Sequence, residues 1–147
     1  MKKLGYLLVL LISLSSFAFS NVNEKVDWSL FSNNLEKSLK SENLGVRLSA
    51  MQMIIRYSDK IDVSKGVYDV MREFRNNDDQ NVRKLALITL YKMQNDWAID
   101  FLKRQYRFED NSDIKNKIER IVVAYDNNDQ QKIANVVNET LLSIALK

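Results

Sequence analysis

Apolar positions recur along this chain with a helical spacing that appears three times. When three stretches are aligned on Val46, Val82 and Ile114, apolar residues or tyrosine follow at offsets of 4, 8 and 11 in each one. Such offsets lie along one side of an α-helix. The three stretches therefore predict amphipathic helices that bury the same face. The aligned positions are Ala50, Ile54 and Tyr57, then Ala86, Leu90 and Met93, then Ile118, Val122 and Tyr125.

Polar residues beside these stripes repeat as well. Asn43, Asp79 and Asn111 stand three residues before the aligned positions. Short side chains of this kind accept a hydrogen bond from the free backbone N–H groups of a first helical turn, so each one predicts a helix start.

A second pair of related segments lies between these helices. Residues 67–75 match residues 99–107 at a shift of 32, with apolar residues and two arginines in register. The predicted unit is therefore helix A, a turn and helix B. Residues 27–40 predict a leading helix, and residues 129–147 predict a closing helix B. The expected fold is all-α, a short α-solenoid of about three helical hairpins plus a leading helix. The chain contains no proline, which favours an almost entirely helical protein.

The capped A helices carry a recurring motif, an Asn or Asp followed by Val-Arg-x-x-Ala. The stretches "NLGVRLSA" and "DQNVRKLA" resemble bacterial HEAT-like (armadillo-type) repeats, whereas "NSDIKNKI" departs from the motif at Lys115 and Ile118. The resemblance covers roughly residues 41–125. It implies a binding scaffold in which the B helices line the inner surface. It also implies that the basic residues after the aligned positions (Arg47, Arg83 and Lys115) pair with a neighbouring repeat and have a structural role.

The B helices provide the candidate binding residues. With Val67, Val70 and Phe74 buried, the arginines of the same helix should lie on its exposed side. Arginine and tyrosine are favoured at protein interfaces, and arginine binds anionic groups. The alternative is a solvated face that is neutralised by Asp69, Glu73 and Asp100. The candidate protein-binding residues are Tyr68, Arg72, Arg75, Lys103, Arg104 and Arg107.

The first residues predict an export signal. Lys2 and Lys3 precede an apolar run, and the small residues that follow this run indicate a cleavage site near Ser20/Asn21. This divides the chain into a signal peptide (1–20) and a HEAT-like α-helical repeat domain (21–147). The mature protein is expected in the periplasm or outside the cell and should not span a membrane. An uncleaved membrane anchor is the competing interpretation.

The composition excludes several kinds of chemistry. The chain has no histidine and no cysteine, so the commonest general base, metal ligand and thiol nucleophile are missing. We therefore expect no catalytic residue, no metal and no cofactor. Clusters of Asn and Asp (76–81, 109–113, 126–130) lack the glycine and distal glutamate of a calcium loop and fit turns better. Without Lys2 and Lys3 the formal net charge falls from +3 to +1, which is not typical of a nucleic-acid binder.

The leading functional hypothesis is an exported, non-catalytic protein–protein interaction scaffold or adaptor that binds a protein or peptide. A chaperone-like or structural cell-envelope factor is the alternative, and it would need exposed apolar residues such as Phe101 and Phe108. A lyase-type helper protein is a further alternative. The oligomeric state stays open.

Overall fold

The computed structural model describes residues 25–145, and the predicted signal peptide lies outside the described residues. Within this range the chain forms seven α-helices, two short 3₁₀ turns and no strand. This confirms the all-α prediction. The helices are α2 (Trp28–Leu39), α3 (Leu44–Tyr57), α4 (Val67–Asn76), α5 (Gln80–Lys92), α6 (Asp96–Gln105), α7 (Ser112–Asp126) and α8 (Gln130–Ala145), with 3₁₀ turns η2 (Ser64–Gly66) and η3 (Tyr106–Phe108).

The helix starts follow the capping prediction. The side chains of Asn43, Asp79 and Asn111 each accept a backbone hydrogen bond from the first turn of α3, α5 and α7. Two further caps, Asp27 before α2 and Asn95 before α6, act in the same way. Helices α3, α5 and α7 are the predicted A helices, and each begins directly after the capping residue that the sequence pattern indicates.

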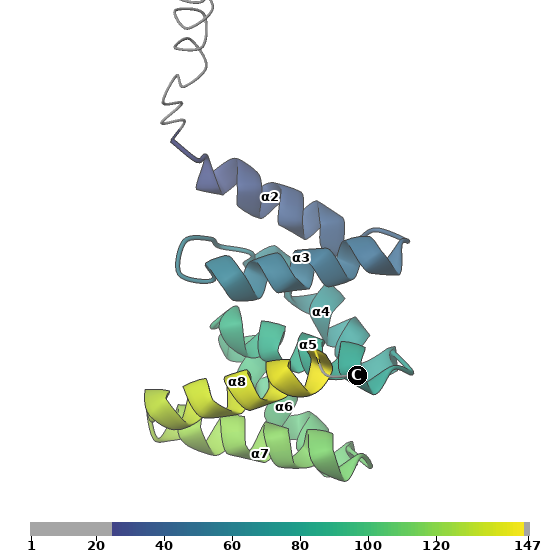
Figure 1. Cartoon of the computed structure of the whole chain (residues 1–147), viewed down its shortest axis with the longest axis vertical. Coiled ribbons are helices and arrows are strands. Elements are labelled where there is room, and N and C mark those ends of the chain that lie inside the picture. Colours follow the sequence, from purple (N-terminus) through teal and green to yellow (C-terminus); the bar gives the residue numbers. More distant parts are fainter. Residues whose placement is uncertain (1–24, 146–147) are drawn as a thin grey trace, which may run out of the picture.

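Helices that occupy equivalent positions in the predicted repeat pack on one another in chain order. Helix α3 packs on α5 and α5 on α7, while α4 contacts α6 and the leading helix α2 lies on α3. Figure 1 shows this order from α2 to α7 along the long axis of the molecule. The rings of Phe74 and Phe101 join α4 to α6 edge to face, with their centroids 5.9 Å apart.

Helix α4 does not pair with α3, its partner in the first predicted A–B unit, although α7 and α8 do pack closely together as the third unit predicts. Helix α4 packs extensively on α5, the helix that follows it, and this is a more extensive contact than the one with α3. The reason is the length of the connections. A short turn at 77–79 joins α4 to α5, whereas the longer segment 58–66 separates α3 from α4. The longer segment allows α4 to move away from α3.

Helix α8 does not take the place expected of a closing helix B. Its main contacts are with α7 and α5, not with α6. Figure 1 shows α8 on the near side of the molecule and α6 behind it. Ile133, Val136 and Val137 of α8 are buried in this contact region.

Helix α5 explains this placement because it is buried on nearly all sides. Its second half reads Ala-Leu-Ile-Thr-Leu-Tyr from Ala86 to Tyr91, and every one of these residues is buried. A helix that is apolar all round needs neighbours on all sides. The predicted stripe accounts for only one side, and α8 covers another.

The stripe itself is largely confirmed. Ala50, Ile54, Ala86, Leu90 and Ile118 are buried. The exception is Val46, 41% of which is exposed at a shallow groove between α2 and α3. Among residues 25–145, no helix has the length and apolar character that crossing a membrane requires.

Candidate functional site

The candidate residues of the B helices all lie on the outside of the molecule. We call the exposed sides of α4, of α6 and of the 3₁₀ turn η3 that follows it the B-helix surface. Val67, Val70 and Phe74 are buried on the opposite side of α4, as the amphipathic pattern predicts. The surface includes all six candidate residues, Tyr68, Arg72, Arg75, Lys103, Arg104 and Arg107, and each of them is exposed.

Part of the positive charge on this surface is compensated. Arg72 Nη2 lies 3.2 Å from Asp69 Oδ1 on the same helix. Lys103 Nζ lies 2.8 Å from Asp126 Oδ1 on α7. The hydrogen bond from Lys103 to Asp126 raises the pKa of this ammonium group above its usual value. The basic side chain of each pair is exposed to solvent, so these pairs contribute little to stability.

The remaining arginines are not compensated by the described residues. Arg104 and Arg107 make no ion pair within residues 25–145, and Arg75 donates only to the amide oxygen of Asn76 at 3.3 Å. Glu73 does not neutralise them, contrary to the solvated-face interpretation, because it is buried and its carboxylate binds Arg47. Three guanidinium groups therefore remain accessible to an anionic partner.

An aromatic pair that the repeat pattern missed lies at the other end of this surface. Trp97 of α6 is 64% exposed and Tyr68 of α4 is 59% exposed. Their rings meet edge to face with centroids 6.0 Å apart. The sequence contains a signal for this exposure. Trp97 directly precedes Ala98 and Ile99, which are buried in α6, and neighbouring residues of a helix do not share a face, so the indole lies on the other side.

The two phenylalanines expected on the inner face separate in the structure. Phe101 is buried against Phe74, so it is not one of the exposed apolar residues that the chaperone-like alternative needs. Phe108 in η3 is 75% exposed. The difference arises because Phe101 continues the buried stripe of α6, whereas Phe108 follows the end of that helix.

The basic residues that recur at the same position of α3, α5 and α7 have a structural explanation, as the resemblance implies. Arg47 Nε lies 2.7 Å from Glu73 Oε1, and Arg83 binds Glu109 with two guanidinium nitrogens. Arg83 Nε also donates to the carbonyl oxygen of Phe74 at 2.8 Å. These side chains connect each A helix to neighbouring segments and are not available to a ligand.

The third basic residue uses a different contact. Lys115 lies over the ring of Tyr106, with Nζ 5.1 Å from the centroid, as Arg83 lies over Phe74 at 5.3 Å. Both basic residues stand nine positions after their aromatic partner. The contacts of Arg47, Arg83 and Lys115 therefore support a structural role for all three basic residues.

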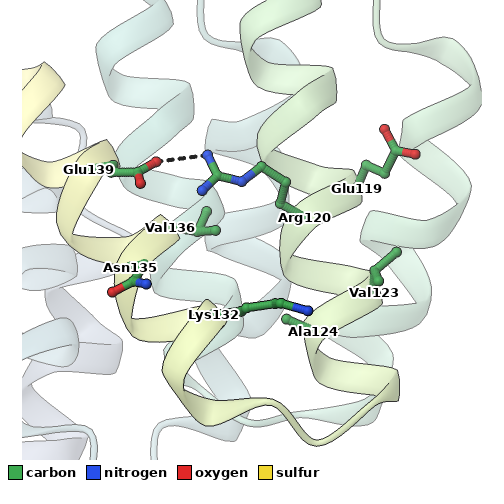
Figure 2. Close-up of a pocket in the computed structure, with 8 residues that line it drawn as sticks. All are labelled: Glu119, Arg120, Val123, Ala124, Lys132, Asn135, Val136 and Glu139. Atoms are coloured by element: carbon green, nitrogen blue, oxygen red, sulfur yellow. Dashed lines mark hydrogen bonds and ion pairs between the residues drawn. The ribbon is translucent and has the colours of Figure 1, made fainter.

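A groove of about 460 Å³ lies between α7 and α8. Figure 2 shows Arg120 of α7 reaching across it to Glu139 of α8, with the guanidinium Nη1 2.7 Å from the carboxylate oxygen. This hydrogen bond lowers the pKa of Glu139 and raises that of Arg120. A carboxylate held ionised in this way is a poor general acid. The floor is formed by the buried side chains of Ala124 and Val136.

The Asn and Asp clusters form turns and caps. Asp79, Asn111 and Asp129 bind backbone N–H groups at the starts of α5, α7 and α8. Within the described range, no group of three or more acidic residues has the arrangement that a metal ion requires.

Comparison of the chain with protein-family models, with curated proteins and with solved structures found no match.

Proposed function

We propose that this protein is a non-catalytic binding scaffold, an α-solenoid of HEAT-like repeats that presents its B-helix surface to a protein or peptide. The observation that carries the proposal is the combination on one surface of three uncompensated arginines with two exposed aromatic rings. Arginine, tyrosine and tryptophan are the residues that most often dominate binding energy at protein interfaces.

The packing supports this kind of function. Helices that stack in chain order build an extended and rigid surface from small units. The basic side chains inside the stack (Arg47, Arg83 and Lys115) are occupied in holding neighbouring segments together. By contrast, Arg75, Arg104 and Arg107 of the B-helix surface form no ion pair within residues 25–145 and remain on the surface.

We further propose that the protein works outside the cytoplasm. The support comes from the charged, apolar and small-residue regions of the first twenty residues, which are typical of a cleavable export signal. Mass spectrometry of the mature protein should find an N-terminus near Asn21. A mature chain that retains Met1 would contradict export by cleavage.

The binding function is tested by reversing charge on the surface. We expect the affinity-tagged protein to capture one stoichiometric partner from the extracytoplasmic fraction of its native cells, and Arg72→Glu combined with Arg104→Glu to abolish capture. The matched control, Lys37→Glu with Lys132→Glu, reverses the same charge on exposed side chains of α2 and α8. Capture that survives in the arginine variant, or is lost equally in the control, would contradict the proposal.

A chaperone-like function is the second candidate, and the 75% exposure of Phe108 favours it. An unfolded client offers apolar side chains, which bind exposed aromatic residues. Suppression of the aggregation of a thermally unfolded test protein, lost on Phe108→Ser and retained in the arginine variant, would support this candidate over the scaffold.

A further inference from the structure

The charged residues of the B-helix surface are distributed unevenly along its helices. Helices α4 and α6 both belong to the B set and run from an acidic end to a basic end. Asp69, Asp96 and Asp100 lie in the first half of their helices. Arg72, Arg75, Lys103 and Arg104 lie in the second half, and Arg107 lies in η3, directly after α6. Asp96 and Asp100 form no ion pair within residues 25–145.

The helix macrodipole explains the sign of charge at each end, because acidic residues stabilise a helix start and basic residues a helix end. It does not explain the two large aromatic rings at the acidic end. Tyr68 and Trp97 are more than half exposed, although each ring could bury well over 100 Å² in a contact. They contact each other edge to face, so the pair forms a single platform across the two helices.

The basic end is open to an anion. The nearest acidic residues in the following loops, Asp78 and Asp110, form no ion pair with the arginines of the described chain. Glu109 is directed inward to Arg83. Guanidinium groups in such a position bind carboxylates with two parallel hydrogen bonds.

The distance between the two ends limits the shape of the partner. Seven residues of α4 separate Tyr68 from Arg75, which corresponds to about 10 Å along the axis at 1.5 Å per residue. Trp97 and Arg107 are ten residues apart, eight steps along α6 and two in η3, which corresponds to about 16 Å. An extended peptide rises roughly 3.3 Å per residue, so three to five residues would bridge these two ends.

We propose that the B-helix surface binds an extended acidic peptide segment, with one aromatic or proline ring on the Tyr68–Trp97 platform and a group of carboxylates three to five residues away on Arg75, Arg104 and Arg107. This inference rests on the proposed scaffold function and specifies its partner. Trp97 is the principal anchor, and the arginines determine the orientation of the segment.

The probe is a capped synthetic peptide, WSGSGEEE, which places four residues between the ring and the first carboxylate. We expect it to shift the backbone amide NMR signals of α4 and α6 with a dissociation constant below about 1 mM, weakening as salt is added. Replacing its tryptophan by serine, or its glutamates by lysines, should weaken binding at least about tenfold.

The protein variants are Trp97→Ser and the pair Arg104→Glu with Arg107→Glu, and each should also weaken binding at least about tenfold. The control is Leu142→Ser on α8, a residue that is 62% exposed and lies outside the surface. All variants change exposed side chains, and an unchanged melting temperature would show that they fold.

The outcomes distinguish this inference from the function on which it rests. Peptide binding that depends on the arginines and not on Trp97 overturns the aromatic anchor and leaves the scaffold function in place. Absence of peptide binding while the native partner is still captured through the arginines also overturns only the inference. Loss of arginine dependence in both experiments overturns both. Retention on insoluble polysaccharide that needs Trp97 and not the arginines would show that the platform binds sugar, and this also overturns the inference.

Discussion

At the scale of single residues, two ion pairs with the same chemistry differ in their environment. Glu109 is 7% exposed and binds Arg83, whose side chain is 19% exposed. Glu139 binds Arg120, and both side chains are largely in solvent. Removal of one partner from a buried pair leaves an uncompensated charge, whereas water replaces the partner in an exposed pair.

We therefore expect Glu109→Gln to lower the free energy of unfolding by about 2 kcal/mol, somewhat less than for a fully buried pair because Arg83 keeps some access to water. The measurement is urea denaturation followed by circular dichroism. Glu139→Gln is the matched control and should leave the midpoint unchanged within error. Equal losses in the two variants would show that burial does not decide the strength of these pairs.

At the scale of helices, α8 shows how a tertiary contact overrides a sequence pattern. The apolar stripe of α8 (Ile133, Val137, Leu141 and Ile144) predicts correctly that the segment is helical and that Ile133 and Val137 are buried, but it misses the buried Val136 and Thr140. It does not reveal the neighbour, because any apolar surface of sufficient area can accept such a stripe. The deciding feature is the second apolar side of α5.

Helix α8 has a buried side and an exposed side, so substitutions on the two sides should differ in their effect on stability. Val136 is 1% exposed and Leu142 is 62% exposed. Val136→Asp would place a carboxylate in the contact with α5 and α7 and should cost about 3 kcal/mol or more, whereas Leu142→Asp should change stability by less than about 0.5 kcal/mol. Urea midpoints of the two variants measure the difference. Similar midpoints would mean that α8 is not held against the core in solution.

At the scale of the whole molecule, the first helix of the stack is held by fewer contacts than an interior helix. Helix α2 contacts α3 and η2, and only Ser32, Leu35 and Leu39 of α2 are buried. Helix α6 contacts α4, α5 and α7 and belongs to the middle of the stack. Stability is not uniform in such structures, since elements with few buried contacts open first.

The two tryptophans report on these two regions. Trp28 of α2 packs against the rings of Phe31 and Tyr57, and Trp97 belongs to α6. In single-tryptophan variants made by Trp97→Phe and Trp28→Phe, we expect the fluorescence of Trp28 to change at lower urea concentration than that of Trp97. Coincident curves in both variants, matching the circular dichroism curve, would instead indicate that α2 unfolds together with the rest of the chain.

Features that depend on residues close together in the chain could be predicted from the sequence, whereas features that depend on which helices meet could not. Caps, amphipathic stripes and helix limits depend on residues a few positions apart, and Asn43, Asp79 and Asn111 were identified from such local rules. The burial of Phe101 and the inward direction of Glu109 depend on which helices meet, and local spacing holds no information about that. The exposed candidates of the binding surface were predictable because exposure follows from the stripe. Trp97 was not identified because it has no counterpart in another repeat.

The position of α8 also has a consequence for how this chain can change its length. A new unit added after α8 would find α7 and α5 already covered on that side, and would have no continuous surface on which to stack. An insertion of one complete A–B module between α4 and α5 would leave the contacts of α8 with α5 and α7 as they are. Lineages that lengthen or shorten this protein should therefore vary in the interior and preserve the final helix.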